Sequence, residues 1–417
     1  MRRAGSLGAG RPPGDACTSL ARVSDAEEHL LVAGYESGRV AVLDARAGGS
    51  GNPPAGADEG REVEDLLCAP GAAQPVVVVA AGERVSMLDL RKASCSAAGC
   101  AVRLAAVSTS AAAPAPAGGL PVGEPQRLAL HSKGEEVAVA GDSGDIGLLR
   151  LRAAAGEMAP GRILRNGHAN ACSGLAYVCW RPSELVSGGM DNALARWDTG
   201  RARVLSSWDT SVRTRCAGAE AVAPSRTRFW LPGAGAGAAA AAGAAEDDHP
   251  GAQLFNPPFV HDVAAPPPRA GAGGRGGATR AVAAACGDGS VLVTRLWGQA
   301  GPGRGGKRAA AAAAPSAADV IALGREEGGH ASSASCVAFL GGGGPRDEAV
   351  VSCGNDRRIV LWTGVLAALG APGSECASAS VLHGRKMNRL CVMSDGPRGA
   401  QVAVADTSNA VSLYRID

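Results

Sequence analysis

One short pattern occurs seven times along this chain, and it limits the possible folds more than any other feature. Each copy has an apolar strand, a tight turn rich in Gly, Asp and Asn, and a second strand that ends in an aromatic residue or leucine beside a charge. Such recurring units each pack on their neighbours, so the repeat determines the fold. The copies lie at 29–44, 76–89, 136–150, 184–198, 281–297, 349–362 and 402–415.

The spacing of the copies identifies the repeating unit. The residues that close the second strands follow one another at intervals of 45, 61, 48, 100, 65 and 52 residues. The shortest intervals are close to the ~40–45 residues of a four-stranded propeller blade. Ala/Gly/Pro-rich stretches explain the longer ones, because they hold too little apolar side chain to offset the entropy of ordering. The sequence therefore predicts an all-β fold, a seven-bladed β-propeller with Ala/Gly/Pro-rich loop insertions.

Residues 1–417 are predicted to form a single domain, since a propeller needs no single core that grows with chain length. The last copy stops at 417, one strand short of a blade. A segment within 1–16, near 3–10, is therefore expected to supply the missing strand and close the ring. We place the blades at 17–62, 63–122, 123–164, 165–215, 253–300, 319–370 and 378–417, with low-complexity inserts at 216–252, 265–279 and 298–318.

Two copies carry four residue types whose chemistry is complementary. In each, an Asp stands six residues before a Trp, within the hairpin turn, where an Asx side chain satisfies backbone donors. A Gly-His pair upstream and a strand Ser complete a set that can form a buried hydrogen-bonded network. The sets resemble the signature of the WD40 repeat family, which implies structural roles for both histidines. They are Gly167-His168, Ser187, Asp191 and Trp197, and Gly329-His330, Ser352, Asp356 and Trp362.

Three segments are similar to a narrower group within that family. They are SGGMDNALARW at 187–197, QLFNPPFVHDV at 253–263 and QVAVADTSNAVSLYRID at 401–417. The most specific of them holds Leu254, Asn256, Pro257 and His261. Together the three segments resemble the WD repeat-containing protein 53 family, and the resemblance covers most of the chain outside the inserts. The dipeptide after Asn256 is expected to start a strand, because proline is tolerated at a first strand position.

Composition limits the partners and the compartment. Lys and Arg number 41 against 39 Asp and Glu, a net charge of +2, so no general attraction to nucleic acid or anionic membranes is expected. No apolar run is long enough to span a bilayer, and no secretory signal is present. The 12 cysteines lack zinc-site spacing and fit a reducing compartment. We expect a cytoplasmic or nuclear protein, or one found in both, with no metal and no cofactor.

One string resembles the nucleophile segment of a serine protease, but it falls where the other copies place their turn. It is the run from Gly141 to Asp145, GDSGD. Gly and Asp are the residues that a hairpin turn requires, whereas catalysis needs a His base and a buried Asp beside the serine. The sequence therefore predicts a turn here, and a protein that is not an enzyme.

The most specific candidates for binding are two Asp-x-Arg segments after second strands, Asp44/Arg46 and Asp89/Arg91. They resemble the Trp-Asp-x-Arg box of WD40 substrate receptors, with Leu in place of Trp, which implies docking on the cullin-4 adaptor DDB-one. The simpler alternative is that these charges only solvate a loop. The resemblance implies a ubiquitin-ligase substrate receptor, a monomer within a complex, with the adaptor and an unknown substrate as partners. The alternative function is a general WD40 scaffold in a chromatin or ribonucleoprotein assembly.

Overall fold

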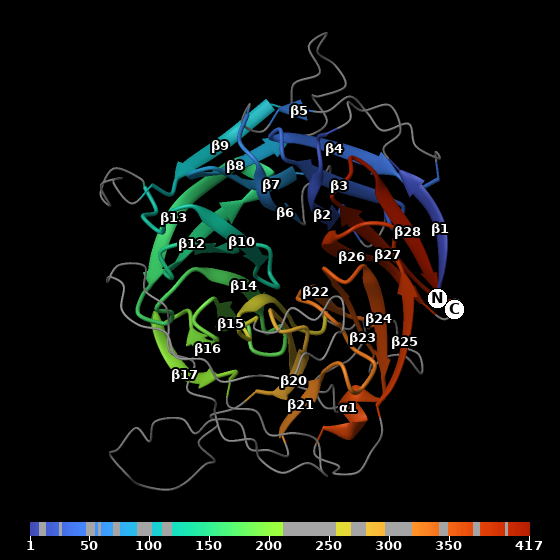
Figure 1. The fold of residues 1–417 in the computed structure, drawn as a ribbon. Coiled ribbons are helices and arrows are strands. Elements are labelled where there is room, and N and C mark those ends of the chain that lie inside the picture. The colour runs from blue at the N-terminus through green and yellow to red at the C-terminus, as the bar shows by residue number, and fades with distance from the viewer. Residues whose placement is uncertain are drawn as a thin grey trace, which may run out of the picture.

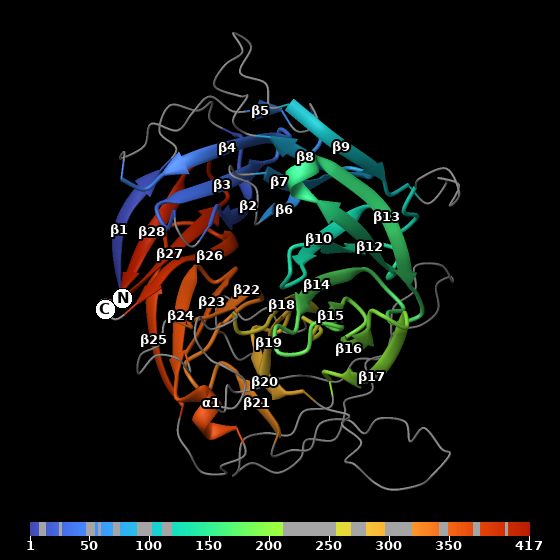
Figure 2. The same ribbon diagram turned by 180° about the vertical axis from the view of Figure 1, so that it is seen from behind.

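The computed structural model of the chain is a ring of seven four-stranded antiparallel sheets (Figures 1 and 2). The seven-bladed β-propeller predicted from the repeat is thereby confirmed. The inserts predicted at 216–252 and 298–318 lie outside the described residues, as do 268–279 of the third insert, Leu254 and Trp297. The structure describes residues 1–7, 14–24, 27–46, 55–56, 60–69, 76–89, 102–110, 119–211, 256–267, 281–296, 319–341, 349–369, 376–396 and 399–417.

In six blades the strands follow chain order from the central channel to the rim. Blade 1 contains β2 (Cys17–Arg22), β3 (Leu30–Tyr35), β4 (Arg39–Asp44) and β5 (Ala55–Gly56). Blade 2 contains β6 (Val63–Ala69), β7 (Val76–Ala81), β8 (Arg84–Asp89) and β9 (Val102–Ser108). Blade 3 contains β10 (Pro125–Leu130), β11 (Glu136–Gly141), β12 (Ile146–Arg152) and β13 (Glu157–Leu164), with the 3-10 helix η3 (Ala153–Ala155) before β13.

The next three blades have the same order. Blade 4 contains β14 (Cys172–Tyr177), β15 (Glu184–Gly189), β16 (Ala193–Asp198) and β17 (Arg203–Asp209). Blade 5 contains β18 (Val260–Ala264), β19 (Ala281–Cys286), β20 (Val291–Arg295) and β21 (Val320–Leu323). Blade 6 contains β22 (Ala334–Phe339), β23 (Val350–Gly354), β24 (Arg358–Thr363) and β25 (Ala377–Leu382), with the short helix α1 (Val365–Ala368) before β25.

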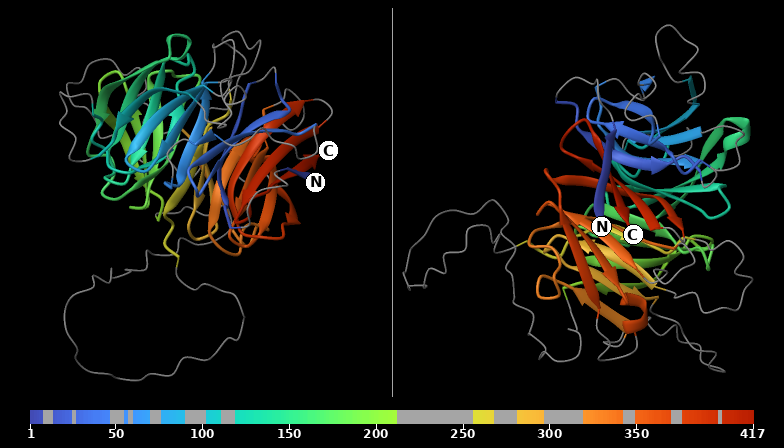
Figure 3. Two further views of the ribbon diagram at one scale, coloured as in Figure 1. Left: turned by 90° about the horizontal axis from the view of Figure 1, so that it is seen from above. Right: turned by 90° about the vertical axis from the view of Figure 1, so that its right-hand side faces the viewer.

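The two ends of the chain close the ring within blade 7. Its inner three strands are β26 (Met387–Gly396), β27 (Gly399–Asp406) and β28 (Val411–Ile416). Its outer strand is β1 (Arg2–Leu7), which pairs antiparallel with β28, and the two termini lie side by side (Figure 3). The N-terminal segment thus supplies the missing strand, one residue earlier than the predicted start at residue 3.

Three boundaries differ from the sequence-based placement. The sequence placed the start of the sixth blade at 319, but β21 is the outer strand of blade 5. It placed the start of the seventh blade at 378, but β25 is the outer strand of blade 6. The residues from Asn256 to Phe259 are not in a strand, and β18 begins only at Val260. The cause is common to all three, because Ala/Gly/Pro-rich insertions separate these segments from the hairpins that the pattern identifies.

The apolar core is divided among the blade interfaces. Seven clusters of buried residues are present, and each joins two neighbouring blades. The second strands are therefore covered on both faces, and all six residues of β7 and of β19 are buried. This explains why those strands are continuous apolar runs. Each blade packs on its neighbours, so chain length does not limit the core.

The hairpins divide the loops between two faces of the disc. We call one of these faces the mouth face. The inner strands begin there, and the hairpin turns between the second and third strands lie there too. In blade 1, Cys17 at the start of β2 pairs with Tyr35 at the end of β3, and Gly34 pairs with Val40 in β4. At the opposite face the inner and third strands end, as Leu30 pairs with Asp44. Among the described residues, no helix is long and apolar enough to cross a membrane.

Candidate functional site

All seven inner strands contain a β-bulge at the same place, directly after their first residue. A bulge inserts one residue that has no partner on the neighbouring strand, and it redirects that side chain. The seven inserted residues all line one cavity of about 460 Å³ at the mouth of the central channel. We call them the bulge ring; they are Thr18, Glu64, Gln126, Ser173, His261, Ser335 and Asn388.

The bulge ring has a signature in the sequence that the hairpin pattern did not capture. Each inner strand begins with a buried residue, then the polar bulged residue, then a variable residue, then a buried Leu or Val. Among the residues predicted as specific, only His261 belongs to the ring. The seven four-residue segments are CTSL at 17–20, VEDL at 63–66, PQRL at 125–128, CSGL at 172–175, VHDV at 260–263, ASCV at 334–337 and MNRL at 387–390.

Three members of the ring hold neighbouring blades together. Asn388 Nδ2 donates a hydrogen bond to the carbonyl of Cys17, 3.0 Å away, and so joins blade 7 to blade 1. Thr18 Oγ1 donates to the first carbonyl of β6 at 2.6 Å, and Ser173 Oγ donates to the first carbonyl of β18. In these three blades the bulged side chain therefore has a structural role.

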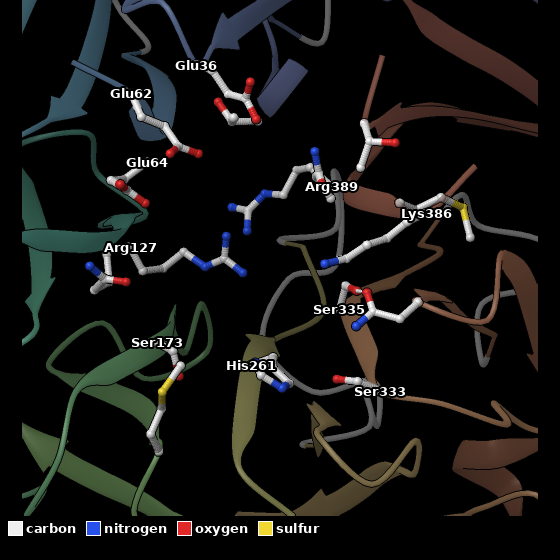
Figure 4. A pocket seen from close by; sticks show the side chains of 17 residues that line it. Glu36, Glu62, Glu64, Arg127, Ser173, His261, Ser333, Ser335, Lys386 and Arg389 are labelled. Atoms are coloured by element: carbon white, nitrogen blue, oxygen red, sulfur yellow. Dashed lines mark hydrogen bonds between the residues drawn. The ribbon is translucent and has the colours of Figure 1, made fainter. Parts of the chain in front are cut away.

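Charged side chains of both signs converge on the cavity from four blades. Figure 4 shows glutamates on one side of the mouth, a lysine on the other, and two guanidinium groups between them. The acidic group, which we call the glutamate cluster, comes from blades 1 and 2, and the basic residues come from blades 3 and 7. The glutamate cluster is Glu36, Glu62 and Glu64, and the basic residues are Arg127, Lys386 and Arg389.

The two arginines are neutralised by buried aspartates on the inner strands of other blades. Arg127 Nη2 lies 2.6 Å from Asp262 Oδ1, and its Nη1 lies 3.9 Å from Asp65 Oδ1. Arg389 Nη2 donates to Asp65 Oδ1 at 2.8 Å. These four residues occupy the same position in their strands, directly after the bulge. Ring closure therefore brings together residues that are far apart in sequence.

Both aspartates also connect their blade to the next one through the backbone. Asp65 Oδ2 accepts a hydrogen bond from the Leu128 amide at 2.8 Å, and Asp262 Oδ2 accepts one from the Val337 amide at 3.1 Å. Burial raises the pKa of Asp65 to about 6, although Arg127 and the Leu128 amide favour the ionised form. Burial has the opposite effect on the arginine, because it lowers the pKa of Arg127. The carboxylates of Asp262 and Asp65 outweigh burial, so the pKa of Arg127 is raised overall.

The glutamate cluster has no such compensation. None of its three side chains has an ion pair or hydrogen bond to another described residue. Burial, followed by the charges of Glu62, Glu124 and Asp65, raises the pKa of Glu64 to about 7. Burial and the charges of Glu36 and Glu124 also raise the pKa of Glu62. The free protein therefore holds carboxylates that repel one another at neutral pH.

We expect Glu64→Gln to stabilise the protein at about pH 8, by about 1–2 kcal/mol after allowance for solvent screening. The pKa of Glu64 is about 7 in the folded chain against an ordinary value of 4.5, so the folded state binds the proton more readily. Stability contributed by this group is present below pH 4.5 and is lost as the pH rises through 7. Urea unfolding of both proteins from about pH 4 to pH 8 measures this. A destabilised variant at the upper pH would contradict it.

The network expected in blades 4 and 6 is present in both. In blade 4, Trp197 Nε1 donates to Ser187 Oγ at 2.7 Å, and His168 Nε2 lies 2.7 Å from the same oxygen. His168 Nδ1 lies 3.1 Å from Asp191 Oδ1, so the chain of bonds runs from the indole to the hairpin turn. The Gly-His pair has a steric cause, because a Cβ at Gly167 would stand 1.9 Å from the indole.

Blade 6 repeats the arrangement with the same atoms. Trp362 Nε1 donates to Ser352 Oγ at 3.0 Å, and His330 bridges Ser352 and Asp356 at 2.9 and 3.0 Å. The side chains of both network histidines are fully buried. Burial would raise the pKa of Asp356, but the hydrogen bond and charge of His330 and the amides of Ala331 and Arg358 together outweigh it, so the pKa is lowered. These residues belong to the framework of the blades and lie outside the mouth cavity.

A third network, in blade 7, was not predicted. His383 Nδ1 lies 2.6 Å from the hydroxyl of Tyr414, and His383 Nε2 lies 2.6 Å from Asp406 Oδ2. In blades 4 and 6 the histidine Nδ1 faces the aspartate, whereas in blade 7 the histidine Nε2 does. The sequence signal was altered, because Tyr replaces Trp and the histidine precedes its glycine, Gly384.

The two Asp-x-Arg segments follow third strands at the opposite face. Asp44 ends β4, and Arg46 Nη2 lies 3.1 Å from Asp44 Oδ2, with 68% of the arginine side chain exposed. The hydrogen bonds from the side chain and backbone of Arg46 lower the pKa of Asp44. Asp89 ends β8 and is only 1% exposed, so its carboxylate does not solvate a loop. Arg91 lies outside the described residues.

The protease-like string forms a hairpin turn, as expected. Gly141 ends β11, Gly144 has a φ of +82°, and Ser143 Oγ donates to the carbonyl of Val122 at 2.7 Å. The part of the chain that the structure describes contains no group of three or more His, Cys, Asp or Glu side chains placed to hold a metal ion.

No protein-family model matches the chain. The structure establishes the architecture and the faces on which the candidate residues lie. The mouth face carries the polar cavity, and the opposite face carries Asp44 and Arg46. The chain is a seven-bladed β-propeller, compatible with a protein-binding scaffold.

Proposed function

We propose that this protein is a non-enzymatic WD40 scaffold that docks on the cullin-4 adaptor through Asp44 and Arg46 and binds a client at the mouth face. The observation that carries the proposal is the position of the two features on opposite faces of one rigid disc. Such a layout allows two partners to be bound at once without a steric conflict. The histidine networks of blades 4 and 6 and the segments similar to the WD repeat-containing protein 53 family support the same proposal.

The geometry of Arg46 suits recognition by a partner. Its backbone N–H donates to Asp44 Oδ1 at 2.8 Å, and its Nε and Nη2 hold the same carboxylate at 3.3 and 3.1 Å. The remaining edge of the guanidinium, with Nη1, is left to donate outward. An arginine held in this way loses little further entropy on binding, and arginines are frequent among the residues that dominate interface energies.

Asp89 has a different place in the proposal. Because Asp89 is buried at the end of β8, we propose that it anchors the end of this strand, two residues before Arg91. Arg46 then provides the contact, and Arg91 is a second candidate for it. Leu43 and Leu88, which replace the Trp of the box, are almost fully buried at the ends of their strands.

We expect Arg46→Ala to weaken capture of the adaptor about tenfold or more, which corresponds to about 1.4 kcal/mol, within the range for a charge-assisted hydrogen bond. The measurement is a pull-down from cell extract of wild type, each single variant and Arg46→Ala/Arg91→Ala, with quantification by mass spectrometry. Arg152→Ala is the matched control. Arg152 has the same place in blade 3, where it is 79% exposed and pairs with Glu157 rather than with an Asp two residues earlier.

Two results would contradict the proposal. One is that the adaptor does not co-purify with wild type, and the other is that the double variant captures it as well as wild type does. Chromatin or ribonucleoprotein components that co-purify reproducibly with both proteins would instead favour the general scaffold.

A further inference from the structure

We infer that the channel mouth binds an extended segment of a client protein that presents a Lys or Arg side chain to the glutamate cluster. This inference rests on the proposed function only in that it assigns the client to the mouth face. The chemical class of the ligand is inferred from the residues that line the cavity.

Glu64 differs from the other members of the bulge ring, because it is the one carboxylate among them. In blades 1, 4 and 7 the bulged side chain donates a hydrogen bond to the next blade. An ionised carboxylate has no proton to donate, so Glu64 cannot make that bond to the neighbouring blade 3. It lines the cavity without a hydrogen-bond or ion-pair partner among the described residues.

The charges around the cavity favour a cationic ligand beside Glu62 and Glu64. Asp65 and Asp262 neutralise the two arginines, and the remaining cation, Lys386, lies across the mouth from Glu62 and Glu64 (Figure 4). The charges that act on Glu64 are those of Glu62, Glu124 and Asp65, all acidic. A cationic group from a ligand would relieve this repulsion. Since no metal-binding group is present among the described residues, an organic cation fits better than a metal ion.

Arg127 favours a peptide over a free cation as the ligand. Arg127 is 7% exposed, and its Nε is buried without a hydrogen-bond partner within the described residues. Figure 4 shows its guanidinium directed into the middle of the mouth. A buried N–H of this kind requires an acceptor. Because Nε is closed to solvent, the arginine side chain must shift for the backbone carbonyl of an extended segment to supply this acceptor beside the basic side chain, which a simple amine does not supply.

The size and polarity of the cavity agree with this ligand. A volume of about 460 Å³ is that of a small-molecule site, so it holds one long side chain and a short stretch of backbone, not a folded domain. The other members of the bulge ring, such as Gln126 and Ser335, offer further polar contacts around the rim.

The test uses four mixtures of fluorescein-labelled peptides of about nine residues, an extended length of about 30 Å. The mixtures are identical except for a central Arg, Lys, Gln or Glu. Fluorescence polarisation with the full chain at about pH 8 and 0.15 M salt, where surface attraction is screened, gives the relative affinities. We expect the Arg and Lys mixtures to bind at least about tenfold more tightly than the Gln mixture, a difference of about 1.4 kcal/mol.

Matched variants connect that preference to the cavity. Glu62→Gln/Glu64→Gln should abolish the preference, whereas Glu135→Gln/Glu326→Gln, with the same change in net charge, should retain it. Neither Glu135 nor Glu326 lines the mouth cavity, and both are exposed. Thermal melts verify that all variants are folded. The preference should also weaken from about pH 8 to pH 6, because Glu64 becomes protonated there.

Several outcomes would overturn the inference. They are equal binding of the Arg, Lys and Gln mixtures, an unchanged preference in Glu62→Gln/Glu64→Gln, tighter binding of the Glu mixture that is lost in Lys386→Met, and full competition by spermidine at the affinity of the peptides. The adaptor pull-down on the same variants separates the two proposals. Glu62→Gln/Glu64→Gln should capture the adaptor normally, and Arg46→Ala should bind the peptides normally.

Discussion

Trp362→Ala is expected to lower the free energy of unfolding by about 3–5 kcal/mol, the range for removal of a buried aromatic side chain. The indole is fully buried and belongs to the apolar cluster between blades 5 and 6. Its loss leaves a cavity at that interface and removes the N–H that Ser352 accepts. Trp197→Ala should have a similar cost at the interface between blades 3 and 4, where Trp197 has the equivalent contacts. Urea unfolding followed by far-ultraviolet circular dichroism measures both.

Two controls separate the parts of this effect. Trp362→Phe keeps most of the apolar volume but removes the donor, so its cost should be nearer to about 1 kcal/mol. Arg46→Ala, on an exposed side chain, should change stability by less than about 1 kcal/mol. Arg91→Ala is expected to cost equally little. If either arginine variant proved more damaging than Trp362→Ala, the division between structural and docking residues would be wrong.

The parts of the fold that were predicted from sequence are those in which neighbours in sequence are neighbours in space. The second and third strands of every blade form a hairpin, so apolar runs and turn residues reveal them. The same locality explains the networks around His168 and His330, whose members lie within one blade. Outer strands carry less signal. β25 is ASASVL and is mostly exposed, so neither alternation nor a buried face marks it as the outer strand of blade 6.

The mouth cavity was not predicted, because its residues come together only when the ring closes. Asp65, Arg127, Asp262 and Arg389 are isolated charges in the sequence, and nothing local indicates that they are buried or paired. Each of these positions directly follows a β-bulge, which only the strand pairing reveals. The seven four-residue segments that begin the inner strands become comparable only after the strands are known. The function of the mouth therefore depends on contacts that only the three-dimensional structure shows.

Arg127→Met is expected to destabilise the protein by about 3–5 kcal/mol at about pH 8, the range for removing one partner of a buried ion pair. Arg127 is the only described cation that contacts Asp262, at 2.6 Å, and it lies 3.9 Å from Asp65. Without it, the carboxyl of Asp262 remains buried, and the only described donors to it are the backbone amides of Val263 and Val337. Urea unfolding at about pH 8 and pH 5 is the measurement.

The dependence on pH and a second substitution identify the cause. The pKa of Asp65 is raised to about 6 by burial, above an ordinary value of 3.8, so its ionisation costs stability as the pH rises through that range. Loss of Arg127 raises that pKa further, and the penalty should therefore be smaller at about pH 5 than at pH 8. In Arg127→Met/Asp262→Asn no unpaired charge remains at this pair, so most of the loss should be recovered. If the double variant were as unstable as the sum of the single variants, lost packing of the arginine stem rather than an unpaired aspartate would explain the effect.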